Sequence, residues 1–63
     1  MVFLLQTVES WMGFINGTRV DRVWLPAGTY FDCWYRHGDW VYLYDDEPDP
    51  LVFSVRAESS ILS

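Results

Sequence analysis

Apolar and polar residues alternate along most of this chain, and turn-forming residues interrupt the alternation at short intervals. Asn16-Gly17 is a strong signal for a two-residue hairpin turn. Pro26-Ala27-Gly28, Arg36-His37-Gly38 and Pro48-Asp49-Pro50 mark three further breaks. The residues between the breaks are mostly β-branched or aromatic, which favours strands. The pattern therefore predicts five strands, over about residues 2–15, 18–25, 29–36, 39–45 and 51–57.

Five short antiparallel strands in 63 residues predict a single small all-β domain that spans residues 1–63. The expected architecture is a five-stranded antiparallel SH3-like barrel or a strongly bent meander. The first strand is long, and we expect it to bend or bulge near Glu9-Ser10. Residues Glu58 to Leu62 could add one short C-terminal helical turn.

The turn at residues 36–38 determines which side chains share a face of the sheet. A three-residue loop that ends in Gly commonly forms a β-bulge, and Arg36-His37-Gly38 fits that pattern. Trp34 then pairs with Trp40, and alternate residues point to opposite faces. The face expected to form the core carries Phe31, Cys33, Val41 and Leu43. The opposite face carries an aromatic ladder with one carboxylate: Tyr30, Asp32, Trp34, Trp40, Tyr42 and Tyr44.

Two other loop lengths are open at the turn of residues 36–38, and the first hairpin can be analysed in the same way. A loop of two or four residues at the third turn exchanges the faces of one strand relative to the other. In the first hairpin, a two-residue Asn16-Gly17 turn pairs Phe14 with Arg19 and Met12 with Asp21. The same turn places Trp11 opposite Arg22, which allows a cation–π contact between them.

Charge narrows the range of partners. The net charge is −5, and all four basic residues are Arg. Direct binding of nucleic acid needs a basic patch, and anionic membranes attract basic proteins, so neither partner is expected. No stretch is long enough to span a bilayer, and the start MVFLLQTVES lacks the basic region of a signal peptide. A single Cys fits a reducing compartment, so we expect a cytoplasmic protein.

Catalytic and metal-binding signals are weak in this sequence. Cys33 and His37 are the candidates for a nucleophile and a base, but they are four positions apart on strand and turn, about 13 Å in an extended chain. One Cys and one His do not supply the roughly four ligands of a structural zinc site. No phosphate-binding or cofactor motif is present. We therefore expect no enzymatic activity, no cofactor and no metal.

An acidic run follows the aromatic ladder directly: Asp45-Asp46-Glu47-Pro48-Asp49. In an extended chain its charges lie about 4 Å apart, close to the ~3.4 Å spacing of phosphates along one DNA strand. Rings beside carboxylates suit a basic protein surface. We expect a non-enzymatic acidic inhibitor or modulator of a nucleic-acid-binding protein, a nucleic-acid mimic of the type that phages and mobile elements encode. The expected contact residues are Tyr30, Asp32, Trp34, Trp40, Tyr42, Tyr44, Asp45, Asp46, Glu47 and Asp49.

A second interpretation treats the same features as structural. In a domain this small, an aromatic ladder can serve as core, and an acidic run can be a solvated loop. The protein would then be an SH3-like structural or adaptor module that forms a homodimer or serves as a small subunit of a larger assembly. The sequence leaves both interpretations open.

Overall fold

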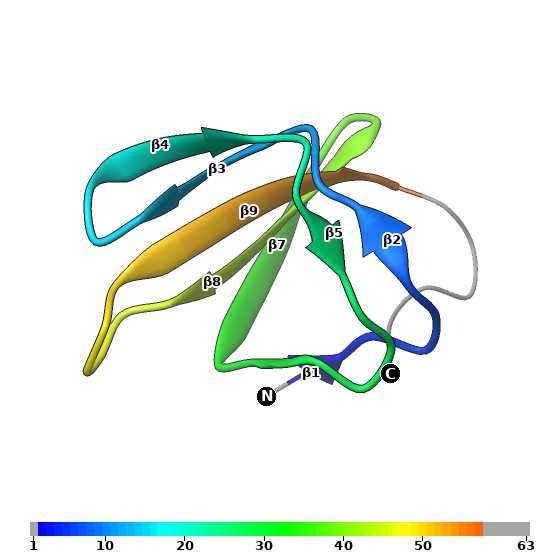
Figure 1. Ribbon diagram of the computed structural model, residues 1–63. Coiled ribbons are helices and arrows are strands. Elements are labelled where there is room, and N and C mark those ends of the chain that lie inside the picture. Colours follow the sequence, from blue (N-terminus) through cyan, green and yellow to red (C-terminus); the bar gives the residue numbers. More distant parts are fainter. Residues whose placement is uncertain (1, 58–63) are drawn as a thin grey trace.

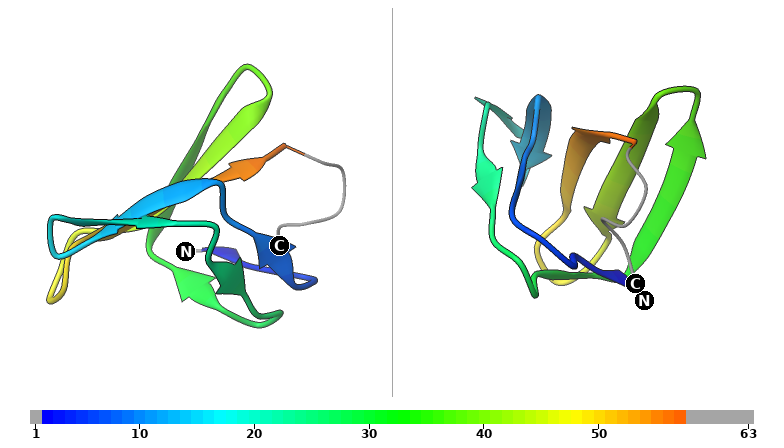
Figure 2. Two further views of the ribbon diagram at one scale, coloured as in Figure 1. Left: turned by 45° about the horizontal axis from the view of Figure 1, so that its top comes forward. Right: turned by 90° about the vertical axis from the view of Figure 1, so that its right-hand side faces the viewer.

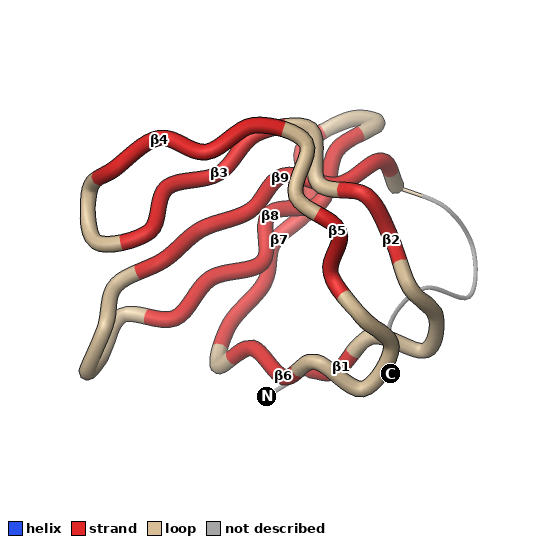
Figure 3. Tube along the Cα trace, in the orientation of Figure 1, coloured by secondary structure: helices blue, strands red, loops and turns tan. Residues whose placement is uncertain are grey.

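The computed structural model describes residues 2–57, and this part of the chain consists entirely of strands, turns and loops (Figures 1 and 3). No helix occurs in that part of the chain, so the all-β prediction is confirmed. The predicted helical turn at Glu58 to Leu62 lies outside the described residues. The strands are β1 (Val2–Phe3), β2 (Val8–Glu9), β3 (Met12–Ile15), β4 (Thr18–Asp21), β5 (Trp24–Leu25), β6 (Tyr30–Phe31), β7 (Cys33–His37), β8 (Trp40–Asp45) and β9 (Leu51–Arg56).

Five of the strands form one antiparallel sheet in the order β4-β3-β9-β8-β7. The remaining strands form two short antiparallel pairs, β1 with β6 and β2 with β5, which lie to one side of this sheet (Figures 1 and 2). The three sheets do not close into a barrel. Strand β9 is the last strand of residues 2–57, yet it lies at the centre of the large sheet.

The five predicted strands are present, but three of them are interrupted. The predicted first strand divides into β1, β2 and β3, and the bend near Glu9-Ser10 is confirmed. Its cause is a change of partner: Ser10 N donates to Val23 O over 2.7 Å, and Trp11 N donates to Ser54 O over 2.9 Å. The chain therefore leaves the β2–β5 pair and joins the large sheet between these two residues.

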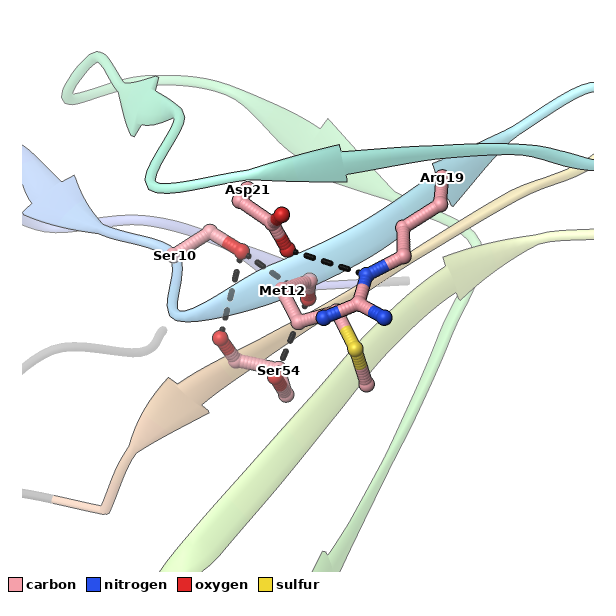
Figure 4. Close-up of polar contacts among 5 residues, drawn as sticks. All are labelled: Ser10, Met12, Arg19, Asp21 and Ser54. Carbon is pink, nitrogen blue, oxygen red and sulfur yellow. Dashed lines mark hydrogen bonds and ion pairs between the residues drawn. The ribbon is translucent and has the colours of Figure 1, made fainter.

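Two buried hydroxyl groups stabilise this bend (Figure 4). Ser54 Oγ donates to the Met12 carbonyl over 3.0 Å. Ser10 Oγ lies 3.1 Å from the same carbonyl and 3.2 Å from the carbonyl of Ser54. Both serines are buried, and a buried hydroxyl without a partner would destabilise the fold. Their hydrogen bonds join β3 to β9 where the chain turns.

The core is mostly aliphatic. It fills the space between the large sheet and the two short pairs, with Phe31 packed edge-on against Phe53 at 6.1 Å between ring centroids. The prediction that Phe31, Val41 and Leu43 are core residues is confirmed, since each is buried. The buried apolar residues are Val2, Leu4, Leu25, Phe31, Val41, Leu43, Phe53 and Val55.

The first hairpin has the predicted register. Met12 pairs with Asp21 and Phe14 with Arg19, around an Asn16-Gly17 turn. Both turn residues have positive φ, 51° and 82°, as a type I′ turn requires. The predicted cation–π contact is also present, because the Arg22 guanidinium lies 5.2 Å from the centroid of the Trp11 ring.

The predicted register of the second hairpin is wrong. His37 pairs with Trp40, so the turn has two residues, Gly38-Asp39, and not three. Gly38 has φ of 61°, and Gly at the first central position is typical of a type II′ turn. Trp34 consequently pairs with Leu43 instead of Trp40, and Tyr35 pairs with Tyr42.

Cys33 also lies on a different face from the one predicted. A bend at Asp32 separates β6 from β7, so Phe31 and Cys33 do not alternate along one continuous strand. Phe31 is buried, whereas Cys33 is half-buried and pairs with Tyr44 on the other face of the sheet. The assignment of Cys33 to the core is therefore wrong.

Candidate functional site: an aromatic groove beside an acidic loop

The large sheet has one face that points away from the core, here called the outer face. The strand registers arrange its residues in rows that cross the sheet from β3 through β9 and β8 to β7. One row is Phe14, Val52, Tyr44 and Cys33, and the next is Met12, Ser54, Tyr42 and Tyr35. Within residues 2–57, no other strand lies over this face (Figure 2).

A hollow of about 310 Å³ opens at the end of the outer face where β8 leads into its loop. We call it the aromatic groove. Val52 lies between Phe14 and Tyr44 in their row, so a short side chain separates two rings. Neighbouring strands are about 4.8 Å apart, which puts the two ring-bearing residues about 10 Å apart. The lining residues are Phe14, Gly17, Tyr35, Tyr44, Asp45, Asp46, Pro50, Leu51 and Val52.

Stacked rings form one wall of the aromatic groove. Tyr35 stacks on Tyr42 with ring centroids 4.9 Å apart and an interplanar angle of 18°. The same Tyr35 ring meets Tyr44 edge-on, at 5.9 Å and 69°. Tyr35 nevertheless stays half exposed, because nothing in the described part of the chain covers it. The wall is thus ordered by contacts among its own rings and remains open to a partner.

The loop between β8 and β9 closes the end of the aromatic groove. One carboxylate oxygen of Asp45 accepts a hydrogen bond from Asp32 N, which fixes the start of the loop. Asn16 N donates to Pro50 O over 2.8 Å, which ties the end of the loop to the β3–β4 turn. Asp46, Glu47 and Asp49 between these anchors are exposed, and we call residues 46–49 the acidic loop.

Charge from the acidic loop reaches the aromatic groove. The pKa of Tyr44 is raised above its ordinary value, first by negative charge on Cys33 and then by partial burial, a hydrogen bond with Cys33 and the charge on Asp46. The ordinary pKa of a tyrosine phenol already leaves it neutral at physiological pH, and the raised pKa of Tyr44 acts in the same direction. The groove therefore combines neutral rings with two acidic lining residues, Asp45 and Asp46.

The outer face brings together only part of the predicted contact set. Tyr42 and Tyr44 lie on it, and Asp45 and Asp46 line the groove at its end. Trp40 is on the same face but at the opposite end. Glu47 and Asp49 lie in the acidic loop.

Three predicted contact residues lie elsewhere, Trp34 because of the corrected register and Tyr30 and Asp32 because of the bend between β6 and β7. Tyr30 is exposed and packs its ring against Phe3, at 5.4 Å between centroids. Asp32 occupies the bend between β6 and β7. Trp34 points to the core side of β7, at the edge of the sheet, where it remains about half exposed.

Phe14, Tyr35, Leu51 and Val52 belong to the groove but were missed from the sequence. A signal existed for Tyr35, because Gly38-Asp39 is also a two-residue hairpin sequence, and that register puts Tyr35 beside Tyr42. No local signal existed for Phe14 and Val52. Their proximity depends on the pairing of β3 with β9, which lie far apart in the chain.

The other end of the outer face carries a stack of two Trp and two Arg. The Arg56 guanidinium lies 4.8 Å from the Trp40 ring centroid, and Arg22 lies 5.2 Å from that of Trp11. The Trp11 and Trp40 rings are 6.4 Å apart at an angle of 52°. The outer face therefore has an acidic end and a basic end.

The described part of the structure does not bring together the residues that the sequence offered for catalysis or for metal binding. Cys33 and His37 stand at opposite ends of β7. Among residues 2–57, no three His, Cys, Asp or Glu side chains are grouped so that they could hold a metal ion. The described chain also contains no helix that is long and apolar enough to cross a membrane. Comparisons with protein-family models, curated proteins and solved structures found no match.

Proposed function

We propose that this is a non-enzymatic binding protein, which docks its aromatic groove and acidic loop on a basic surface of another protein. The observation that carries the proposal is that Asp45 and Asp46 line the same hollow as the rings of Phe14, Tyr35 and Tyr44. In protein interfaces, aromatic side chains supply most of the binding energy, while charges at the rim accelerate association. This groove offers both on one surface.

The distribution of rings supports docking over a purely structural role. Phe31 and Phe53 are the only aromatic residues in the buried core of the described chain. Phe14, Tyr35 and Trp11 on or beside the outer face are 38%, 50% and 57% exposed. Large exposed apolar surfaces on small proteins are typical of interaction sites.

The sharpest form of the proposal is an inhibitor or modulator of a nucleic-acid-binding protein. Such proteins present basic clefts that bind phosphates, and a group of neighbouring carboxylates can occupy them. A cytoplasmic location, an origin in a phage or mobile element, and an SH3-like relationship for the open, curved sheet belong to the same proposal. The protein itself would not bind nucleic acid, because its net charge is −5.

The test compares two variants of equal net charge. In the loop variant, Asp46→Asn, Glu47→Gln and Asp49→Asn neutralise the acidic loop and leave Asp45 to hold Asp32 N. In the control variant, Glu9→Gln, Asp32→Asn and Asp39→Asn neutralise three exposed carboxylates outside that loop. A partner is isolated from the native host with the parent protein, purified, and its association rate with each protein is measured at several salt concentrations.

We expect the loop variant to associate more slowly than the control variant and to show a flatter dependence on salt. Duplex DNA or RNA should compete with the parent protein for this partner. Equal association rates for the two variants would contradict a specific role for the acidic loop. A partner that nucleic acid does not displace would contradict the mimicry.

The open edges of the large sheet support a second candidate function, a module that forms homodimers or joins a larger assembly. Strands β4 and β7 are the outermost strands, and each has backbone groups available to pair with another strand. Analytical ultracentrifugation distinguishes the two functions. A stable dimer in which Trp34 on β7 is protected from fluorescence quenchers would favour assembly through this edge.

A further inference from the structure

The shape of the aromatic groove suits one flat side chain. Phe14 and Tyr44 flank Val52 in a single row, and side chains on a sheet stand roughly perpendicular to it. The strands that carry the two rings are about 10 Å apart, so a planar cation midway between the rings would lie about 5 Å from each, within the ~6 Å reach of a cation–π contact. The side chain of Val52 forms an apolar floor between them.

The charge of the groove selects a cation. Two acidic residues line it, Asp45 and Asp46, and the lining residues in the described chain include no Lys, Arg or His. The Asp45 carboxylate already accepts a hydrogen bond from Asp32 N, which leaves that of Asp46 as the available charge. Arg19, which pairs with Phe14 from β4, has its guanidinium engaged by Asp21 at 3.1 Å. Asp46 is exposed and has no ion pair in the described part of the chain, so its charge is available to a ligand.

We propose that the aromatic groove binds the side chain of an arginine from the partner protein, with the guanidinium between the Phe14 and Tyr44 rings and with Asp46 as its counter-charge. This inference rests on the proposed docking function and names the group that is recognised. A guanidinium is planar, always charged and weakly hydrated, and it stacks on aromatic faces. Lysine has no planar face to fill the space between two rings, and an uncharged ring would leave Asp46 without a role.

The protein uses the same chemistry elsewhere on its outer face. Arg22 lies over Trp11 and Arg56 over Trp40, at 5.2 Å and 4.8 Å from the ring centroids. Those rings already have their cations. The rings of the aromatic groove have none within the described chain, although carboxylates stand beside them.

The test uses the full chain and two peptides, one with a single arginine between Gly and Ser residues and one with citrulline in its place. Citrulline has nearly the same shape as arginine but no charge. Binding is followed by NMR through the ring signals of Phe14, Tyr44 and Trp11. We expect saturable shifts of the Phe14 and Tyr44 signals with the arginine peptide, and at least about 5-fold weaker binding of the citrulline peptide.

The substitution Tyr44→Leu removes one wall of the groove, and Asp46→Asn removes the charge. Each should weaken binding of the arginine peptide by about 2–5-fold, the range of a single exposed cation–π contact. The matched control is Tyr30→Leu, since Tyr30 is an exposed ring outside the groove and its loss should leave binding unchanged. If Tyr44→Leu fails to fold, Phe14→Leu tests the opposite wall.

Three results would overturn the inference: equal binding of the two peptides, shifts confined to Trp11, or unchanged binding by the groove variants. The arginine site and the docking function are contradicted by different results. If the loop variant associates more slowly with the purified partner but the arginine peptide does not bind the groove, the docking function is supported and the arginine site is contradicted. If the peptide binds the groove as expected but the loop variant associates as fast as its charge-matched control, the arginine site is supported and the docking mechanism is contradicted.

Discussion

Gly13 lies in β3 directly opposite Phe53, at the centre of the large sheet. Its backbone is close to its neighbours: a Cβ atom at this position would lie 2.5 Å from Phe53 Cδ1 and 2.6 Å from the Val52 carbonyl oxygen. Real Cβ atoms do not approach other atoms so closely, so the ring or the strand would have to move. The absence of a side chain at residue 13 is therefore what lets Phe53 pack into the core.

We expect Gly13→Ala to lower the free energy of unfolding by about 1–3 kcal/mol, because a methyl group forced into a packed core displaces its neighbours. Urea unfolding followed by tryptophan fluorescence measures the change. Thr18→Ala, at an exposed position of β4, is the control and should stay within about 0.5 kcal/mol of the parent. A Gly13→Ala protein as stable as this control would contradict the packing described here.

Tyr44 gives a prediction that depends on pH. Negative charge on Cys33 is the largest of the causes that raise the pKa of Tyr44 above its ordinary value of 10.0. Because the folded pKa is raised, the stabilisation from the protonated phenol is complete below pH 10.0 and is lost as the pH rises through the folded pKa. We expect Cys33→Ala to bring the pKa of Tyr44 down towards its ordinary value, as followed by NMR with isotope-labelled tyrosine.

Asp46→Asn is the comparison for this experiment, because Asp46 is a weaker cause of the shift than Cys33. The pKa of Tyr44 should fall less in the Asp46→Asn variant than in the Cys33→Ala variant. A titration of Tyr44 that is unchanged by Cys33→Ala would show that its thiol is not the main cause.

At the scale of elements, the β7–β8 hairpin shows how one turn determines a surface. The two-residue Gly38-Asp39 turn puts Tyr35 and Tyr42 on the outer face and turns Trp34 to the core side. A three-residue loop would instead put Trp34 on the same face as Tyr42, with Tyr35 on the opposite one. The two registers therefore predict different energetic couplings between these side chains.

A double-mutant cycle with Tyr35→Ala and Tyr42→Ala should give a coupling energy of about 0.5–1.5 kcal/mol, as expected for a stacked aromatic pair. The control cycle with Trp34→Ala and Tyr42→Ala should give a value near zero, since these side chains lie on opposite faces. Unfolding in urea provides the four free energies of each cycle. The reverse outcome, coupling of Trp34 and none of Tyr35, would restore the three-residue loop.

Local signals predicted most of the elements but not how they pair. The Asn16-Gly17 turn gave the correct register of β3 and β4, because only one turn type fits two adjacent residues with positive φ. At residues 36–39 two turn types fit the sequence, and the side-chain pattern favoured the wrong one. The pairing of β9 with both β3 and β8, and the bends at Ser10 and Asp32, depend on contacts between distant segments.

Across the whole molecule, the two ends of the outer face differ in charge and in contacts. Arg22 and Arg56 lie over Trp11 and Trp40 at one end, and the acidic loop follows the aromatic groove at the other. The sequence predicted the combination of rings and carboxylates, because the acidic run follows Tyr44 directly. The sequence alone could not show that Trp40 and Tyr44 lie at opposite ends of the outer face. Arg56 and Trp11 contact Trp40 only when the whole sheet has formed.

The central position of β9 has a consequence for the synthesis of the protein. As the chain leaves the ribosome, the β3–β4 and β7–β8 hairpins emerge first, and a lone two-stranded hairpin is at best marginally stable in water. Each hairpin gains its neighbour only when residues Leu51–Arg56 emerge and pair with both β3 and β8. The nascent chain thus keeps its rings and strand edges uncovered until β9 pairs, and a chain truncated after Pro50 would hold two separate hairpins in place of a sheet.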